Sequence, residues 1–427
     1  MKKFIKLQLK FFSALILRKY QPEIIAISGS IGKTSTKEVI YKILSSRLSV
    51  RTSVKNYNNE IGVPLTIIGL ESPGSSISGW LKVFLKALSL YVFTDKNYPK
   101  YLVLEMGIDR PGDMAYLTRL VSPRIGVMTG VSHSHLEYFG SLNNIKKEKQ
   151  VLIEKVDRRG LSVLNYDNQE ALSMAEVSPA RVLTYGFKEG ADLLAQDLSF
   201  NAAQGDYNIA GINFKLNYEG SIIPVSMPNI LSTGGVYSAL AAVAVALHLG
   251  FNLMEIAGLL RDCRLPAGRM QLLSGVKHSF IIDDSYNSSP ESSVAALRVL
   301  GKIKLDVGAS RYAVFGDMLE IGIYSEKGHK LVGEQVFKSG IDYLISVGER
   351  SRDIDRGAQA IGMSSDYIFH FDDTEAAGLF IQERLSEGDV LLIKGSQGAR
   401  MEKIVKEIMA EPNRAAELLV RQGEEWL

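Results

Sequence analysis

Short apolar runs alternate along the chain with longer segments whose apolar residues recur at helical spacing. The run EIIAIS, at 23–28, ends at a glycine-rich turn, and the helical segment 33–46 follows it. That segment has one apolar face, formed by Val39, Ile40, Ile43 and Leu44. Because strand and helix alternate in this order, the pattern predicts a mostly parallel α/β sheet.

The same alternation continues to the end of the chain, with one interruption. Further strands of the first sheet are predicted at 101–107, 124–130, 161–165 and 180–186. Residues 191–228 alternate and are rich in Gly and Asn, which predicts β-hairpins, and 234–250 is a helix of small residues. After 264–270 the rhythm restarts, with strands predicted at 280–287, 311–318, 342–349, 367–373 and 389–398.

These patterns divide the chain into three parts. Residues 1–22 form a basic, apolar N-terminal helix, 23–264 a central domain of the P-loop ATPase type, and 265–427 a C-terminal Rossmann-like α/β domain. In open α/β sheets, ligands bind beyond the carboxyl ends of the strands. Two such sheets that face each other are therefore expected to enclose a cleft.

Composition narrows the functional classes. The 427 residues are 46% hydrophobic and 22% charged with a formal net charge of +2, so a broad basic surface for nucleic acid is not expected. Any bound anion should be held at a local site. One cysteine, Cys263, and six histidines exclude a disulfide framework and a cysteine zinc cluster, and they favour a reducing compartment such as the cytoplasm.

Two segments raise the question of membrane contact. Residues 1–20 are basic, with an apolar stretch from Phe11 to Leu17 that is far shorter than the ~20 residues needed to span a bilayer. No small-residue cleavage site follows, which argues against a signal peptide. Residues 79–93 are apolar, with Trp80 near one end and two lysines inside. Each segment is explained either as a helix packed on the central domain or as a helix lying on an anionic membrane surface.

The segment AISGSIGKTSTKE has most features of a phosphate-binding loop. The P-loop pattern G-x-x-x-x-G-K-[ST] is met at Gly32, Lys33 and Thr34, but Ile27 stands where the leading glycine is usual. A strand, a flexible turn at Gly29 and a helix N-terminus are nevertheless all present, and together they can hold a phosphate. Lys33 is placed to reach the β- and γ-phosphates, and the Thr34 hydroxyl to bind Mg²⁺.

Other strand ends carry candidate metal ligands. Glu105 closes one predicted strand, and His135 lies just after the next. Because carboxyl ends of neighbouring parallel strands meet at one edge, these groups and Thr34 are expected to converge on metal ions that bridge ATP phosphates. Taken separately, Glu105 is also explained as a helix cap, and His135 as a loop histidine.

A series of motifs, in order from about residue 24 to 404, resembles the Mur ligases. They are SGSIGKTSTKE, NYNNEIGVPLTI, LVLEMGIDRPGDM, SHLEYFGSL, LNYDN, AGRMQ, IDDSYNSSPES, FGDMLEIG and LIKGSQGARME. The resemblance implies an ATP-dependent ligase that makes an amide bond through an acyl phosphate, with two Mg²⁺ ions. It also implies small-molecule partners: NYNNEIGVP and FGDMLE favour addition of D-alanyl-D-alanine to a UDP-N-acetylmuramoyl-tripeptide, a peptidoglycan precursor.

The resemblance further assigns roles to residues at matching positions. Catalysis would rest on Lys33, His135 and Lys149, the last of them carbamylated. One Mg²⁺ would be held by Thr34 and Glu105, and the second by His135 and Lys149. ATP would be bound by Gly29, Ser30, Gly32, Lys33, Thr34, Ser35, Arg269, Asp284 and Asn287. The substrate side would be formed by Asn58, Asn59 and Lys394.

The residues by themselves leave other interpretations open. Lys149 sits among charged neighbours that could form a solvated helix face. Arg269 could be a surface arginine in a salt bridge, and Asn58 and Asn59 an ordinary Asx turn.

Two departures from the family pattern bear on the substrates. Only about 22 residues precede the phosphate strand, so the family's UDP-sugar-binding N-terminal domain is expected to be absent. Gly234 and Gly235 stand where the family has His-Asn, and Ser238 replaces a later Asn, so recognition of adenine is expected to differ. Two alternatives follow: a Mur-type ligase with another acceptor (polyglutamate, cyanophycin-like or lipid-linked), and a nucleotide-binding partner subunit without ligase activity.

Overall fold

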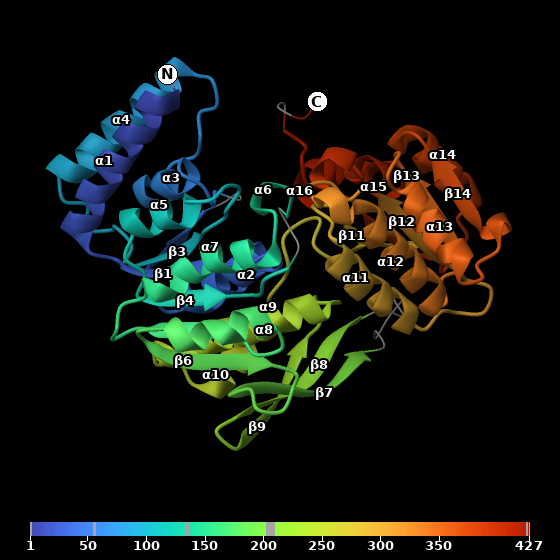
Figure 1. Cartoon of the computed structure of the whole chain (residues 1–427), viewed down its shortest axis with the longest axis horizontal. Helices are drawn as coiled ribbons and strands as arrows, with labels where there is room; N and C mark the ends of the chain where they lie inside the picture. Colours follow the sequence, from blue (N-terminus) through green and yellow to red (C-terminus); the bar gives the residue numbers. More distant parts are fainter. Residues whose placement is uncertain (1, 54–56, 133–135, 202–209, 424–425, 427) are drawn as a thin grey trace.

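Two β-sheets, each covered by helices, form the framework of the protein (Figure 1). The structure is a computed structural model, and it describes residues 2–53, 57–132, 136–201, 210–423 and 426. Within these residues, one sheet has nine strands in the order β2-β3-β1-β4-β5-β6-β7-β8-β9, and the other has six in the order β10-β11-β15-β12-β13-β14. The expected α/β class, with a mostly parallel central sheet and a second α/β sheet, is confirmed.

The first sheet is parallel from β2 to β7 and antiparallel from β7 to β9. Its strands are β1 (Glu23–Ser28), β2 (Val50–Thr52), β3 (Tyr101–Glu105), β4 (Ile125–Met128), β5 (Leu161–Asn165), β6 (Arg181–Gly186), β7 (Leu193–Asn201), β8 (Ala210–Tyr218) and β9 (Ser221–Met227). The hairpins predicted for 191–228 are confirmed by β7 to β9. The sequence does not predict β2, because three residues are too few to show a period.

Helices cover both faces of the first sheet, and β1 contributes to both cores. Its side chains alternate, with Ile25 and Ile27 on one side and Ile24 and Ala26 on the other. The first core holds α2 (Lys33–Leu44), α9 (Thr233–His248) and α10 (Leu253–Arg261). The second holds α1 (Lys2–Tyr20), α3 (Gly62–Ile68), α4 (Ile77–Val92), α5 (Asp113–Leu120) and α7 (Leu142–Glu154). Burial on both faces explains why these strands read as continuous apolar runs.

The second sheet is parallel except for β10, which pairs antiparallel with β11. Its strands are β10 (Gln271–Ser274), β11 (Phe280–Asp284), β12 (Arg311–Gly316), β13 (Tyr343–Val347), β14 (Ile368–Phe371) and β15 (Val390–Lys394). One core holds α11 (Pro290–Lys302), α12 (Ser325–Lys338) and α13 (Arg352–Ala360). The other holds α14 (Thr374–Arg384), α15 (Glu402–Ile408) and α16 (Ala415–Leu418). The predicted boundary near Leu265 falls between α10 and β10.

The segments in which membrane contact is an open question both form helices, α1 and α4. They lie side by side at one end of the molecule, in the blue part of Figure 1. Within the described part of the chain, no helix is both long and apolar enough to cross a bilayer. Two short helices, α6 (Leu136–Phe139) and α8 (Gln169–Leu172), complete the central part near the ends of β4 and β5.

Candidate active site

The loop between β1 and α2 turns on two glycines with positive φ. Gly29 has φ 148°, and a Cβ atom there would lie 1.9 Å from Thr129 Oγ1, so a side chain does not fit. Gly32 has φ 82° and caps the start of α2. Ile27, by contrast, is a fully buried residue of β1. The position of the usual leading glycine therefore belongs to the strand, and the turn is complete without it.

Ser30 fixes this loop against the segment that follows β4. Its N–H donates to the carbonyl oxygen of Gly130 at 2.7 Å, and its hydroxyl accepts from the N–H of Ser132 at 2.9 Å. The N-terminus of α2 is thereby aimed at the space beyond the strand ends. The first N–H groups of a helix have no partner within the helix and favour an anion at that place.

Two lysines meet at one carbonyl oxygen of the loop. Lys33 Nζ donates to the oxygen of Gly29 at 2.8 Å, and Lys149 Nζ, from α7, donates to the same oxygen at 3.0 Å. Lys149 is 1% exposed, so the alternative that it lies on a solvated helix face is wrong. Among the described residues, no carboxylate forms an ion pair with either ammonium group. Two like charges therefore lie close together, with Lys149 buried and Lys33 partly exposed.

This setting disfavours the charged form of both lysines. Burial lowers the pKa of Lys33; Glu105 opposes that shift, and the charge of Arg269 adds to it. Burial also lowers the pKa of Lys149 well below its ordinary value, and the neighbouring Lys33 lowers it further. Desolvation and like-charge repulsion both favour the neutral amine. An anion placed beside the pair would relieve both effects.

Glu105 lies in an oxygen-rich corner next to the loop. Its Oε2 accepts from the Thr34 hydroxyl at 2.9 Å, and its Oε1 accepts from Asn58 Nδ2 at 3.1 Å. Glu105 is 1% exposed and bonded to these two side chains rather than to a helix end. Hydroxyl, carboxylate and amide oxygens are the donors that Mg²⁺ prefers. The residues of this corner therefore fit one Mg²⁺.

The other residues expected to bind metal or substrate are His135, Asn58 and Asn59, and the two asparagines differ in their contacts. His135 lies outside the described residues. In the described part of the chain, no cluster of three His, Cys, Asp or Glu side chains is arranged to hold a metal. Asn59 Oδ1 accepts from the N–H groups of Ile61 and Gly62 at 3.1 and 3.0 Å, so Asn59 makes the turn into α3. The Asx-turn interpretation holds for Asn59, whereas Asn58 contacts Glu105.

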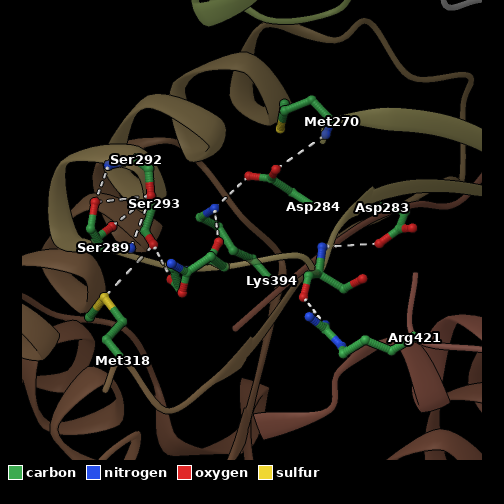
Figure 2. A network of polar contacts seen from close by, with 12 residues as sticks. Met270, Asp283, Asp284, Ser289, Ser292, Ser293, Met318, Lys394 and Arg421 are labelled. Atoms are coloured by element: carbon green, nitrogen blue, oxygen red, sulfur yellow. Dashed lines mark hydrogen bonds and ion pairs between the residues drawn. The ribbon is translucent and has the colours of Figure 1, made fainter. Parts of the chain in front are cut away.

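Residues of the second sheet form the opposite wall of the site, and the buried lysine of this wall, Lys394, is paired with a carboxylate (Figure 2). Lys394, at the end of β15, donates to Asp284 Oδ2 at 2.6 Å and to the carbonyl oxygen of Asn287 at 2.9 Å. Asp284 also accepts from the N–H of Met270 at 3.2 Å. Burial lowers the pKa of Lys394, and Asp284 opposes that shift. These contacts direct Lys394 toward the loop after β11.

Arg269 is held by stacking. Its guanidinium lies 4.1 Å from the centre of the Tyr286 ring, a distance typical of a cation–π contact. No carboxylate among the described residues forms an ion pair with it, so the salt-bridge interpretation of Arg269 finds no support there. Arg269 lines two adjoining hollows, to which residues of both sheets contribute.

A cleft of 710 Å³ lies between these two walls. The central part lines it with Ser30, Gly32, Lys33, Thr34, Asn58 and Glu105, among others. The C-terminal part lines it with Arg269, Tyr286, Asn287, Ser288, Ser289, Ser396 and Gln397, among others. Most of these residues follow the carboxyl ends of strands, which is where open α/β sheets bind ligands. The expected cleft between the sheets is therefore present.

Two further hollows adjoin the cleft. One of 150 Å³ is lined by Ser35, Gly234, Gly235, Asp284 and Lys394, among others. The two glycines bring no side chain to it, so a base bound there would meet backbone at this point. A second hollow, of 520 Å³, lies between α1 and the segment after β3 and shares Gly107 and Asp109 with the cleft.

Several residues that line the cleft were not predicted as site residues from the sequence. Asp109 and Arg110 follow β3, Tyr286 follows β11, and Ser396 and Gln397 follow β15. Each follows the end of an observed strand, and Tyr286, Ser396 and Gln397 fall within the ranges 280–287 and 389–398 predicted as strands. The sequence could therefore place these residues at strand ends, but position at a strand end does not by itself show which side chains face the cleft.

Comparison with known families supplies the context for this geometry. Residues 27–77 and 85–246 match the model described as the Mur ligase middle domain. Residues 268–397 match the model described as the glutamate ligase domain of the Mur ligases. The two matched regions correspond to the two sheets.

Curated relatives are similar over most of the chain. The UDP-N-acetylmuramoyl-tripeptide--D-alanyl-D-alanine ligase of Escherichia coli is 29% identical over 396 residues, which is 92% of this chain and 78% of that protein. The enzyme of the same name from Bacillus subtilis is also 29% identical, over 93% of this chain and 78% of that protein.

Solved structures share the architecture. A crystal structure of MurF from Acinetobacter baumannii is 25% identical and superposes with a TM-score of 0.77, covering 94% of this chain and 79% of that one. MurF ligase from Thermotoga maritima in complex with ADP is 24% identical, has a TM-score of 0.74, and covers 94% of this chain and 83% of that one.

Proposed function

Because the chain belongs to the Mur ligase family, we propose that it is an ATP-dependent ligase that joins D-alanyl-D-alanine to a UDP-N-acetylmuramoyl-tripeptide. One observation carries the proposal: a single cleft is lined both by the phosphate loop of the central sheet and by strand ends of the second sheet. A triphosphate held between these walls would present its terminal phosphate to Lys33. The remaining space would admit the carboxylate of an acceptor.

Nucleotide binding is proposed to use both walls. Lys33 and the first turn of α2 would neutralise the β- and γ-phosphates, with Gly29, Ser30, Gly32 and Ser35 shaping the loop around them. From the opposite wall, Arg269 would donate to phosphate oxygens, and Asp284 and Asn287 would contact the nucleoside side of ATP. A site divided between two domains favours closure around the bound nucleotide.

One Mg²⁺ is assigned to Thr34 and Glu105, with Asn58 holding the orientation of the Glu105 carboxylate. A bound Mg²⁺ neutralises charge between phosphate oxygens and so stabilises phosphoryl transfer. A second ion, with His135 and Lys149 as ligands, belongs to the same proposal.

Lys149 is proposed to act as a carbamate. Its neutral amine attacks the carbon of CO2: a nitrogen–carbon bond forms, one C=O π bond opens onto oxygen, and the nitrogen loses one proton, so that a neutral amine becomes an anionic carbamate. The low pKa of Lys149 favours this step, because the neutral amine is the form that reacts. The product would place a counter-charge beside Lys33, which has no ion-pair partner among the described residues.

The reaction then needs positioning more than nucleophilic help from the protein. An oxygen of the acceptor carboxylate attacks the γ-phosphorus, the bond to ADP breaks, and an acyl phosphate forms. The amine of the dipeptide attacks the acyl carbon, loses a proton, and phosphate leaves with the bonding electrons. Lys33 neutralises the transferred phosphoryl group, and the two walls exclude water that would hydrolyse the acyl phosphate.

The test is a coupled assay with the full chain. Purified protein, ATP with Mg²⁺, UDP-N-acetylmuramoyl-tripeptide and D-alanyl-D-alanine are expected to give one phosphate for each amide formed, with the product identified by mass spectrometry. Omission of either substrate should stop phosphate release. Lys33→Ala should abolish release, whereas Lys42→Ala, which changes an exposed lysine on the same helix, should not.

Other outcomes would select other functions. Phosphate release that requires a different acceptor or amine would reject the muramoyl-tripeptide pair but retain the ligase chemistry. ATP binding without turnover for any pair would favour a nucleotide-binding subunit. Absence of ATP binding by calorimetry, with Mg²⁺ present, would reject the phosphate-loop assignment on which the proposal rests.

A further inference from the structure

The helices α1 and α4 expose an unusual amount of apolar surface. Large apolar side chains that remain exposed recur at helical spacing on both helices, so each has an outward apolar stripe. On α4 these are Ile77, Leu81, Leu85, Leu88 and Val92, which are 75, 60, 56, 44 and 58% exposed. On α1 they are Phe4, Leu7 and Phe11, which are 62, 63 and 57% exposed. We call these eight residues the apolar face.

The opposite sides of the two helices are firmly packed. Leu9 and Ile16 of α1 and Val83 and Ala87 of α4 are buried in the core beside the central sheet. Phe12 and Phe84 bring the helices together, with ring centres 6.3 Å apart. The exposed stripes are therefore a second apolar side on helices whose first apolar side already serves folding.

The carboxyl ends of the two helices are tied together by polar contacts. Lys19 Nζ donates to the carbonyl oxygens of Leu90, Tyr91 and Phe93 at 3.0, 2.9 and 2.8 Å. The Tyr20 hydroxyl donates to the oxygen of Leu90 at 3.0 Å. These contacts satisfy carbonyl groups that the end of α4 leaves open, and they place a cation at the negative end of its dipole. The apolar face is consequently presented on a fixed support.

The charged residues of the chain are also distributed unevenly between these two helices and the rest of the protein. Together α1 and α4 contain eight of the 49 lysines and arginines of the chain and none of its 47 acidic residues. The remainder of the chain therefore has a formal net charge of −6, although the whole chain is at +2. Lys82 and Lys86 on α4 and Arg18 on α1 are exposed, so they border the apolar face.

From this combination we infer that the apolar face of α1 and α4 docks on an anionic lipid surface. Apolar side chains would enter the boundary between headgroups and acyl chains, and the bordering cations would contact the anionic headgroups. The net negative remainder of the chain would be repelled from the same surface, which fixes the orientation. The helices would lie on the membrane without crossing it, in keeping with the absence of a spanning helix in the described residues.

A second copy of the chain fits this surface less well. A symmetric dimer would oppose the same patch on both subunits and bring Lys82 and Lys86 of each close to those of the other. The face is also formed by outward stripes of two helices, and of its eight residues only Leu7 lines one of the hollows described above. An extended apolar surface on two helices that carry cations and no acidic residue is typical of contact with a lipid headgroup layer.

Docking would have a consequence for the neighbouring hollow of 520 Å³. Leu7 belongs both to the apolar face and to the lining of that hollow, and Lys6 and Lys10 of α1 line it too. Its opening would therefore lie close to the lipid surface, and it shares Gly107 and Asp109 with the main cleft. The inference itself does not depend on the proposed ligase activity, because docking is measured without turnover.

Flotation of the full chain with vesicles tests the inference. We expect the protein to float with vesicles of phosphatidylglycerol and phosphatidylcholine, to remain behind with phosphatidylcholine alone, and to be released by high salt. Leu81→Ser with Leu85→Ser, and separately Lys82→Glu with Lys86→Glu, should each reduce the bound fraction by about tenfold or more. The thermal midpoint and the phosphate-release rate without vesicles should stay as in the native chain.

Matched control variants make the same chemical changes elsewhere on the surface. Ile222→Ser with Met254→Ser removes exposed apolar groups, and Lys302→Glu with Lys304→Glu reverses exposed charges away from α1 and α4. Neither should alter flotation.

Absence of flotation with anionic vesicles would overturn the inference, and so would flotation that survives both α4 variants. Dimerisation without vesicles would also overturn it, as would capture of an acidic protein, if the α4 variants abolish that association. None of them would bear on the ligase proposal, which the phosphate-release assay tests separately.

Discussion

The two walls of the cleft hold their buried lysines in opposite ways. On the central side, Lys33 and Lys149 share the carbonyl oxygen of Gly29 and have no carboxylate partner among the described residues. On the C-terminal side, Lys394 has Asp284 at 2.6 Å. Burial lowers the pKa of all three lysines, and Lys149 and Lys394 are equally buried, so the difference between these two is pairing and not solvent exposure.

This difference separates a site that is ready for an anion from a contact that holds a loop. A buried charge without a partner is strongly unfavourable, and its persistence indicates that a ligand or a modification completes it. A buried pair with additional hydrogen bonds is already complete and mainly orients its surroundings. We therefore propose that the central wall is the reactive one, and the five predictions that follow test that proposal.

The largest expected effect is that of Lys33→Ala on turnover. Removal of the cation that we propose to face the γ-phosphate should lower kcat by about 10³-fold or more, since electrostatic stabilisation supplies most of phosphoryl-transfer catalysis. The thermal midpoint should be unchanged or raised, because a buried like charge is lost. Phosphate release and differential scanning calorimetry measure the two quantities. A variant that retains native turnover would show that the anion site lies elsewhere.

The paired wall should respond through stability. Asp284→Ala leaves Lys394 buried without its carboxylate and is expected to lower the free energy of unfolding by about 3–5 kcal/mol. The double variant Asp284→Ala, Lys394→Met should recover most of that loss, because no unpaired charge remains. Urea denaturation of both variants provides the comparison. If the double variant is as unstable as the single one, the pair is not the source of the effect.

Lys149→Met should raise stability while it lowers activity. Replacing an unpaired buried cation by an apolar side chain of similar length is expected to stabilise the protein by about 1–4 kcal/mol in buffer depleted of CO2. Turnover should fall by about 10²-fold, because neither a carbamate nor a metal ligand can form there. Native protein in CO2-depleted buffer should lose activity in the same way and regain it with bicarbonate, whereas Lys149→Met should not respond.

The pH dependence of the stability of Lys149→Met provides a test that does not depend on its activity. The folded-state pKa of Lys149 lies below its ordinary value of 10.5, so between those two values the unfolded chain binds more protons than the folded one. The contribution of Lys149 therefore makes native stability rise with pH in that window. The stability advantage of Lys149→Met should be full below the folded-state pKa and shrink as pH rises from there toward 10.5. An advantage independent of pH would contradict a buried ammonium group.

The smallest expected effect is that of Asn58→Ala. Loss of the hydrogen bond to Glu105 should leave the carboxylate in place but less well oriented, so the concentration of Mg²⁺ needed for half-maximal activity should rise by roughly tenfold. The matched variant Asn59→Ala removes the turn contacts to Ile61 and Gly62. It should lower the thermal midpoint without a comparable change in Mg²⁺ dependence. Equal effects on Mg²⁺ dependence would remove the distinction between the two asparagines.

Strand positions were predictable because burial on both faces leaves an uninterrupted apolar run. The runs at 23–28, 161–165 and 389–398 therefore mark β1, β5 and β15. The short strands β2 and β10 were not predicted, since three or four residues show no period and pair only where a neighbouring edge is available. The phosphate loop was predictable for a similar local reason: a strand, two glycines and a helix start are contiguous in the sequence.

The chain by itself thus determined the order of strands and helices, the loop at Gly29 to Thr34, and the residue types placed at strand ends. Only the tertiary structure decided that Lys149 is buried beside Lys33, that Lys394 is paired with Asp284, and that α1 and α4 leave an apolar face outside. The physical reason is sequence separation. Local patterns report how a segment can fold, whereas the partner of a charge or of an apolar stripe comes from segments far away along the chain.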